Sequence, residues 1–149
     1  MSGLREQVQR DLAEAMKARD AVRVGALRML LTAIVNREKE LRRELTDDEV
    51  REVAAREVKR RTESIEAFEL GARADLVAKE TAERAILQAY APEQLGEAEL
   101  DRIVAEAIAE VGAAGPGDLG KVMGRVMPKV RGRADGALVQ RKVRERLGG

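Results

Sequence analysis

Three basic residues, Lys129, Arg131 and Arg133, alternate around Gly132 near the end of the chain. Asp135 follows them, and aspartate is a preferred residue for capping the N-terminus of a helix. Basic side chains beside a helix N-terminus place ammonium and guanidinium groups next to the free amides of the helix, and all of these groups bind phosphate. The turn offers no aromatic side chain on which a base could stack. We therefore expect it to bind the backbone of a nucleic acid, with a steep dependence on salt.

The distribution of charge points to the same end of the chain. Residues 118–149 carry nine basic and three acidic residues, whereas residues 1–117 carry 19 basic and 24 acidic residues. A basic end on an otherwise acidic chain predicts an anionic partner at that end. The alternative is a pair of helices with a solvated basic surface and no partner. If the partner is RNA, we expect phosphate contacts from Lys121, Arg125, Lys129, Arg131, Arg133 and Lys142.

A second basic run, Lys59-Arg60-Arg61, lies where apolar residues recur at helical spacing. Three successive residues cover most of the circumference of a helix, so one of them must point inward or lie at the edge of the buried face. The structural interpretation is two solvated side chains and one base with a buried stem. The functional interpretation is a second anion contact that faces a cleft between the domains.

The segment from Gly120 to Gly136 is rich in glycine and methionine. Gly120 and Gly124 lie four residues apart, which places them on one helix face and permits close approach of another helix or backbone. Gly132 and Asp135 supply the turn and the cap that follow. Besides the two helical glycines, we expect two rows of side chains to pack inward: Val122 with Val126, and Met123 with Met127.

The residues for most kinds of catalysis are missing. The chain has no Cys and no His, so it has no thiolate nucleophile, no histidine base and no histidine metal ligand. Ser64 lies on a helix beside glutamates, and Asp47 with Asp48 is explained as helix capping. The glycine-rich segment 112–120 is no phosphate loop, because Lys121 is followed by Val122 instead of Ser or Thr. We expect no catalytic residues, no metal, no cofactor and no independent enzymatic activity.

Composition and periodicity predict an all-α protein. Phe68 and Tyr90 are the only aromatic residues, and the apolar content is mostly Ala, Val, Leu, Ile and Met. Caps are expected at Ser2, Asp20 and Thr46, and a fourth helix at about 75–90 buries Leu76, Ala82, Ile86 and Leu87. Pro92 separates these from helices at about 97–111, at 119–127 ended by Pro128, and after Asp135. We predict an N-terminal four-helix domain, residues 1–91, and a small C-terminal three-helix domain, residues 92–149.

No apolar run approaches the roughly 20 residues of a membrane span, and residues 1–10 lack the apolar region of a signal peptide. We expect a cytoplasmic location and no membrane partner.

The chain resembles the YqeY family over essentially its whole length. In the first domain the resemblance rests on Arg28-Met29, on Lys59-Arg60-Arg61 through Phe68, on Gly71 through Leu76 and on Tyr90-Ala91-Pro92-Glu93-Gln94-Leu95. In the second domain it rests on Gly120 through Gly136, which is the most specific block. This block is similar to the tail domain of GatB, a component of the tRNA-dependent amidotransferase.

The resemblance implies a domain that contacts tRNA, with Gly124, Val126-Met127, Gly132 and Ala134-Asp135 in the tail motif. Family members carry the label of carbon–nitrogen ligases with glutamine as amido donor. The serine–lysine machinery of the amidase partner and the metal-binding cradle of GatB have no counterpart in these residues. Our first hypothesis is a module that binds tRNA or a tRNA-like RNA, alone or beside an amidotransferase or an aminoacyl-tRNA synthetase. The alternatives are a protein–protein adaptor, and ligase activity within an amidotransferase complex.

Overall fold

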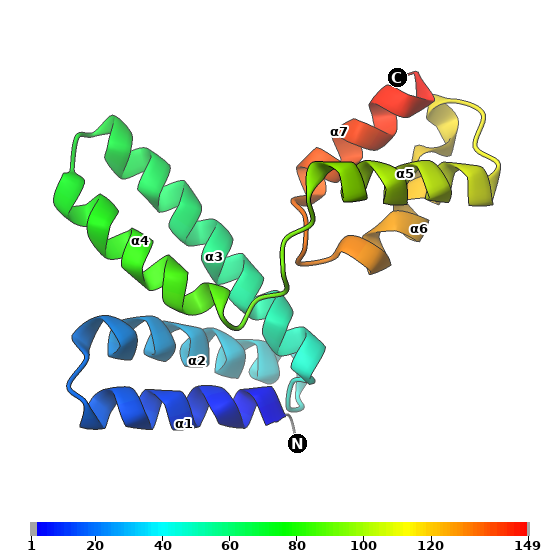
Figure 1. Ribbon diagram of the computed structural model, residues 1–149. Coiled ribbons are helices and arrows are strands. Elements are labelled where there is room, and N and C mark those ends of the chain that lie inside the picture. The colour runs from blue at the N-terminus through cyan, green and yellow to red at the C-terminus, as the bar shows by residue number, and fades with distance from the viewer. Residues whose placement is uncertain (1–2, 149) are drawn as a thin grey trace. The chain divides into compact units, whose positions relative to one another are not determined.

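The computed structural model describes residues 3–148, which form seven α-helices, one short 3-10 helix and no strand (Figure 1). This confirms the all-α prediction; the expected cap at Ser2 lies outside the described residues. The helices are α1 (Gly3–Lys17), α2 (Ala21–Leu41), α3 (Asp47–Leu70), α4 (Ala74–Gln88), α5 (Glu97–Val111), η1 (Pro116–Asp118), α6 (Leu119–Val130) and α7 (Gly136–Leu147). None of these helices has a stretch long and apolar enough to cross a membrane.

The chain divides into two compact units, Met1–Pro92 and Glu93–Gly149, called unit 1 and unit 2 below. Unit 1 holds α1 to α4, with α1 beside α2 and α3 beside α4 (Figure 1). Unit 2 holds α5, α6 and α7. Each unit has its own apolar core, built around Leu27, Leu30 and Ile34 in unit 1 and around Val104 and Val126 in unit 2.

Two predicted caps fix where the helices of unit 1 begin. The Asp20 side chain accepts a hydrogen bond from the Arg23 amide, so the chain turns sharply between α1 and α2. At the start of α3, the Thr46 hydroxyl accepts from the Glu49 amide and the Glu49 carboxylate accepts from the Thr46 amide. This reciprocal arrangement satisfies two amides that a helix start leaves without partners. Both predictions of capping are confirmed.

A buried group of charges joins α3 to α4. The Arg61 side chain lies 3.5 Å from the Glu57 carboxylate, 3.4 Å from that of Glu80 and 3.3 Å from that of Glu83. Glu57, Arg61 and Glu83 are only 5–6% exposed. The prediction that one base of Lys59-Arg60-Arg61 points inward is confirmed. Because Arg61 is enclosed by carboxylates, its interpretation as an anion contact is wrong.

The same group of charges corrects the expected buried face of α4. Of the four apolar residues expected to be buried, Leu87 is enclosed, Leu76 and Ile86 are half-buried, and Ala82 is exposed. Glu83 takes the inward position beside Arg61. Apolar periodicity cannot identify such a face, because a buried carboxylate is stable only beside its partner on another helix.

Tyr90 follows α4 and fastens the end of unit 1 to α1. Its hydroxyl donates a short hydrogen bond to the Asp11 carboxylate, and the residue is 7% exposed. Burial, and then the neighbouring Asp11 carboxylate, raise the pKa of the Tyr90 phenol above its ordinary value. The short segment before Pro92 is therefore anchored to unit 1 by a specific contact as well as by apolar packing.

Pro128 does not end α6, contrary to our prediction; it lies inside the helix, which continues to Val130. Proline removes one donor, the N–H that would bond to the carbonyl of Gly124. Gly124 is exposed, so water can hydrate that carbonyl, and one further turn buries Val130 completely. Burying Val130 stabilises the helix by more than the one missing hydrogen bond destabilises it, so the helix continues past Pro128.

Acid should weaken unit 1 through Glu49. Hydrogen bonds from Arg43 and then from the Thr46 amide lower the pKa of the Glu49 carboxyl from 4.5 to about 2. Its contribution is therefore present above the pKa of the unfolded chain and is lost as the pH falls from about 4.5 to about 2. Glu49→Gln should flatten the fall of the unfolding free energy over this range, as measured by urea titration at each pH. Parallel curves for the two proteins would refute the assignment.

Removing Arg61 should destabilise unit 1 severely. Arg61→Met leaves three carboxylates around an apolar side chain. Removing one partner of a buried ion pair lowers the unfolding free energy by about 3–5 kcal/mol. Arg60→Met is the matched control; its side chain is 69% exposed, and exposed pairs contribute roughly 0–1 kcal/mol. Urea unfolding followed by the fluorescence of Tyr90, the only tyrosine, measures unit 1. Equal losses in the two variants would contradict this account.

Candidate functional site

The predicted anion-binding turn links α6 to α7. The Val130 carbonyl accepts from the Arg133 amide at 2.8 Å and from the Ala134 amide at 3.1 Å. Gly132 has φ +76°, a left-handed conformation that strains residues with a Cβ atom. The Asp135 carboxylate then accepts from the Ala137 amide at 3.1 Å, which confirms the predicted cap of α7. The turn is thus closed by its own backbone.

A second segment holds this turn in place. The Leu95 amide donates to the Arg133 carbonyl at 2.9 Å, and the Gln94 side-chain amide donates to the Gly132 carbonyl at 2.9 Å. The Arg133 guanidinium donates in return to the Glu93 carbonyl at 3.3 Å. Arg133, predicted as a phosphate contact, therefore also has a structural role. Sequence reasoning missed this role of Gln94, although both segments belong to the blocks that carry the family resemblance.

Lys142, which was predicted to contact phosphate, forms ion pairs with acidic residues of α5. Its ammonium group lies 2.8 Å from the Asp101 carboxylate and 3.0 Å from that of Glu97, and its side chain is 11% exposed. The hydrogen bond to Asp101, followed by that to Glu97, raises the pKa of Lys142. We correct the assignment of Lys142: its charge fixes α7 to α5 and is not available to a ligand.

Arg125 and Lys129 are paired less strongly. Both approach the Glu110 carboxylate, at 2.9 and 3.7 Å, but their side chains remain 56% and 44% exposed. Ion pairs this exposed contribute little to stability, so a phosphate group can compete for either cation. Lys121, Arg125 and Lys129 are four residues apart, which places them in one row along α6 with a rise of about 6 Å between neighbours.

Several cations of unit 2 have no carboxylate within ion-pair distance among residues 3–148. Two of them, Lys121 and Arg131, were predicted as contacts, and both are exposed. Three more on α7 are exposed as well and were missed as individual sites: Arg141, Arg144 and Arg146. These three arginines are part of the excess of basic residues after position 118. Helical periodicity alone could not show that they are exposed whereas Lys142 is paired with carboxylates.

The glycines of α6 do not serve the packing role that we predicted. A methyl group added at Gly120 or Gly124 would meet no atom within 4 Å, and both residues are exposed. The inward rows are confirmed, since Val122 and Val126 are fully buried and Met123 and Met127 are half-buried. The backbone of α6 is therefore open to solvent beside the row of cations.

Unit 2 therefore segregates its charges. Helix α5 carries five acidic residues and one basic residue, whereas residues 119–147 carry nine basic and two acidic residues. Residues 3–148 hold no group of three or more acidic residues that could bind a metal. The predicted contacts that remain exposed lie along α6 and in the following turn.

The chain matches the sequence profile of the YqeY-like proteins over residues 5–147. It is 34% identical to the altered inheritance of mitochondria protein 41, mitochondrial, of Pyrenophora tritici-repentis, over 95% of this chain and 80% of that protein. The chain belongs to the YqeY family.

Two further relatives share shorter stretches. The altered inheritance of mitochondria protein 41, mitochondrial, of Saccharomyces cerevisiae is 35% identical over 61% of this chain and 50% of its own length. A component of the glutamyl-tRNA(Gln) amidotransferase of Thermococcus gammatolerans is 44% identical over 57 residues, which are 36% of this chain and 9% of that protein. The YqeY chain thus spans about half of the yeast relative and a small part of the amidotransferase component.

The two kinds of glycine in this region should respond oppositely to alanine. Gly132→Ala places a Cβ atom at φ +76° and should destabilise unit 2 by about 1–2 kcal/mol. Gly124→Ala, inside α6 with open space around it, should stabilise the unit by up to about 1 kcal/mol. Amide hydrogen exchange of α5, α6 and α7 measures both effects in the full chain. Stabilisation by Gly132→Ala would show that the turn is not held as described.

Proposed function

We propose that this YqeY-family protein binds RNA through the basic row of α6, Lys121, Arg125 and Lys129, together with Arg131 in the following turn. The observation that supports this most is the exposure of all four cations, two of which have no acidic partner within ion-pair distance in residues 3–148. Cations in a row along one helix suit a polyphosphate better than a single compact anion, because each can meet a separate phosphate group.

Transfer RNA is the first candidate ligand. The amidotransferase component that shares 57 residues with this chain is named for glutamyl-tRNA(Gln), and the tail motif of Gly120 through Gly136 resembles a domain that contacts tRNA. The basic row lacks an aromatic residue, since Phe68 and Tyr90 both belong to unit 1. Recognition should therefore rest on phosphates and on the shape of the RNA, with little preference for sequence.

An amidotransferase is our first candidate for a protein partner, and an aminoacyl-tRNA synthetase is the second. The support is the similarity to the amidotransferase component of Thermococcus gammatolerans. A pulldown of a partner protein that survives RNase treatment would favour a protein–protein adaptor over an RNA-binding module. The purified chain should not amidate a misacylated tRNA with glutamine, because it has neither Cys nor His and no evident nucleophile. The cytoplasmic location stays a prediction, since two relatives are named as mitochondrial proteins.

Binding of tRNA should lose salt dependence when the basic row is neutralised. If four cations contact phosphates, the logarithm of the affinity should fall with the logarithm of salt concentration with a slope of about −3 to −4. In the triple variant Lys121→Gln, Arg125→Gln, Lys129→Gln the slope should shrink by about 2 to 3, with more than about tenfold weaker binding at low salt. Filter binding across a salt series measures both quantities.

The matched control removes three exposed cations elsewhere, by Lys17→Gln, Arg28→Gln and Arg102→Gln. It lowers the net charge by the same amount, so it should leave the slope unchanged if the row itself binds the RNA. If both triple variants lose the same slope, binding depends on net charge and the row is not the site. If the unaltered protein does not bind tRNA, the proposed function is wrong.

A further inference from the structure

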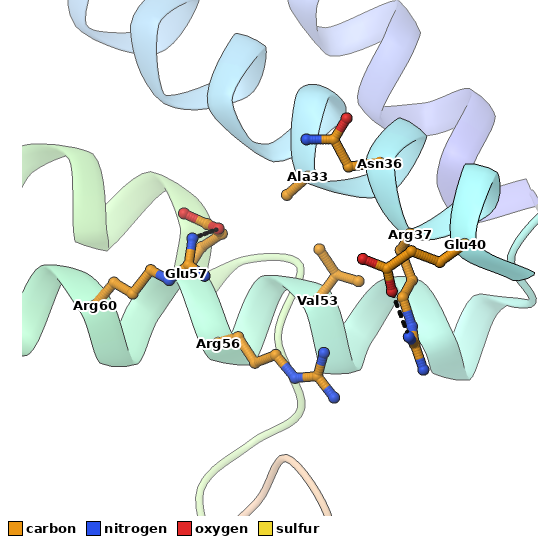
Figure 2. A pocket seen from close by; sticks show the side chains of 8 residues that line it. All are labelled: Ala33, Asn36, Arg37, Glu40, Val53, Arg56, Glu57 and Arg60. Carbon is orange, nitrogen blue, oxygen red and sulfur yellow. Dashed lines mark hydrogen bonds and ion pairs between the residues drawn. The ribbon is translucent and has the colours of Figure 1, made fainter.

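A small pocket lies in unit 1, between α2 and α3, and no part of the proposed RNA-binding row contributes to it. Its volume is about 230 Å³. Figure 2 shows the side chains that line it. Helix α2 contributes Asn36, Arg37 and Glu40 to its wall. Helix α3 contributes Arg56, Glu57 and Arg60, which follow one another along one side of the helix. The wall of the pocket thus contains three arginines from two helices.

The two carboxylates of the pocket are already paired. Glu40 accepts from Arg37 at 2.7 Å, and Glu57 accepts from Arg60 at 3.2 Å. Buried Arg61 also approaches Glu57 from the interior at 3.5 Å, and it is shared with the Glu80 and Glu83 carboxylates. Arg56 is exposed and has no carboxylate within ion-pair distance in residues 3–148. One positive charge of the pocket therefore remains without a counter-charge in the part of the chain that the structure describes.

The arginines of the pocket also have hydrogen-bond donors that these ion pairs do not use. Each guanidinium carries five N–H donors in a planar fork, and the pairs with Glu40 and Glu57 engage one nitrogen each of Arg37 and Arg60. Figure 2 shows the Arg56 side chain on α3 between Arg60 and the Arg37–Glu40 pair. Glu40 is 64% exposed, so it can swing into solvent and release the whole Arg37 fork. The Asn36 side chain lies on the same wall.

An apolar surface beneath these groups strengthens their attraction for an anion. Val53 and Ala33 line the pocket, and Val53 is 7% exposed. Charges interact more strongly beside such a low-dielectric wall than in open water. Guanidinium forks match the geometry of phosphate oxygens in pairs. A cationic ligand is disfavoured, because the wall carries three arginines and only two carboxylates.

We propose that the pocket between α2 and α3 binds a phosphate group, held by Arg56 with Arg37 and Arg60. The volume leaves room for the atoms next to the phosphate, so the group can belong to a free phosphate, to a nucleotide or to an RNA strand. This proposal is independent of the basic row on α6, because every residue in it belongs to unit 1.

Inorganic phosphate is the first probe, with the full chain and with NMR spectra of its backbone amides as the measurement. At constant ionic strength, phosphate should shift the amides of residues 36–40 and 53–60 in a saturable way. Arg56→Gln should weaken this binding about tenfold or more, since it removes a charge-assisted donor. Arg28→Gln is the matched control: it removes an exposed arginine of α2 outside the pocket and should change the affinity less than about twofold.

Shifts that do not saturate, or that weaken equally in both variants, would overturn the proposal. Adenosine monophosphate and an RNA oligonucleotide without a terminal phosphate then identify the source of the group. Tighter binding of the nucleotide at these amides indicates a terminal phosphate, and tighter binding of the oligonucleotide indicates an internal one. The Lys121, Arg125, Lys129 triple variant should retain phosphate binding, which separates a failure here from a failure of the proposed RNA-binding function.

Discussion

Charge compensation within unit 2 determines which of its cations are available to a ligand. Helix α5 supplies the carboxylates, and it uses Glu97 and Asp101 to fix Lys142 and Glu110 to contact Arg125 and Lys129. These pairs differ in kind. The Lys142 side chain is only 11% exposed and contacts two carboxylates, whereas the Arg125 and Lys129 side chains are 56% and 44% exposed and share one carboxylate. The pairs with Glu110 therefore cost little to break. The carboxylates of α5 thus stabilise the fold by binding Lys142 and leave Arg125 and Lys129 exposed on α6.

The geometry of the turn after α6 depends on a segment from the start of the same unit. Gln94 and Leu95 donate to the carbonyls of Gly132 and Arg133, so the turn is held by hydrogen bonds that do not involve the charges of Lys129 or Arg131. A turn held in this way keeps its shape when the side chain of Lys129 or Arg131 binds or releases a ligand, or is substituted. Two segments far apart in the sequence thus form one hydrogen-bonded structure.

The sequence predicted what local chemistry determines and missed what contacts between helices determine. Asp20, Thr46 and Asp135 cap helices as expected, because a cap needs only the amides that follow it. The end of α6 was misjudged because burial of Val130 outweighs the donor that Pro128 lacks. The inward position of Glu83 and the pairing of Lys142 depend on partners 22 and more residues away, on Arg61 and on Asp101. Periodicity along one helix carries no information about such partners.

The run Lys59-Arg60-Arg61 shows how neighbouring residues of one type can take different roles. Arg61 is buried and joins α3 to α4 through Glu80 and Glu83, and it also contacts Glu57 of its own helix. Arg60, one position earlier, lies in the wall of the pocket between α2 and α3, and the two share Glu57. Because Arg61 compensates Glu57 from the interior, that carboxylate repels an anion in the pocket less than a free glutamate would. Through Glu57, the buried charge cluster of unit 1 therefore also contributes to the electrostatic potential of the pocket.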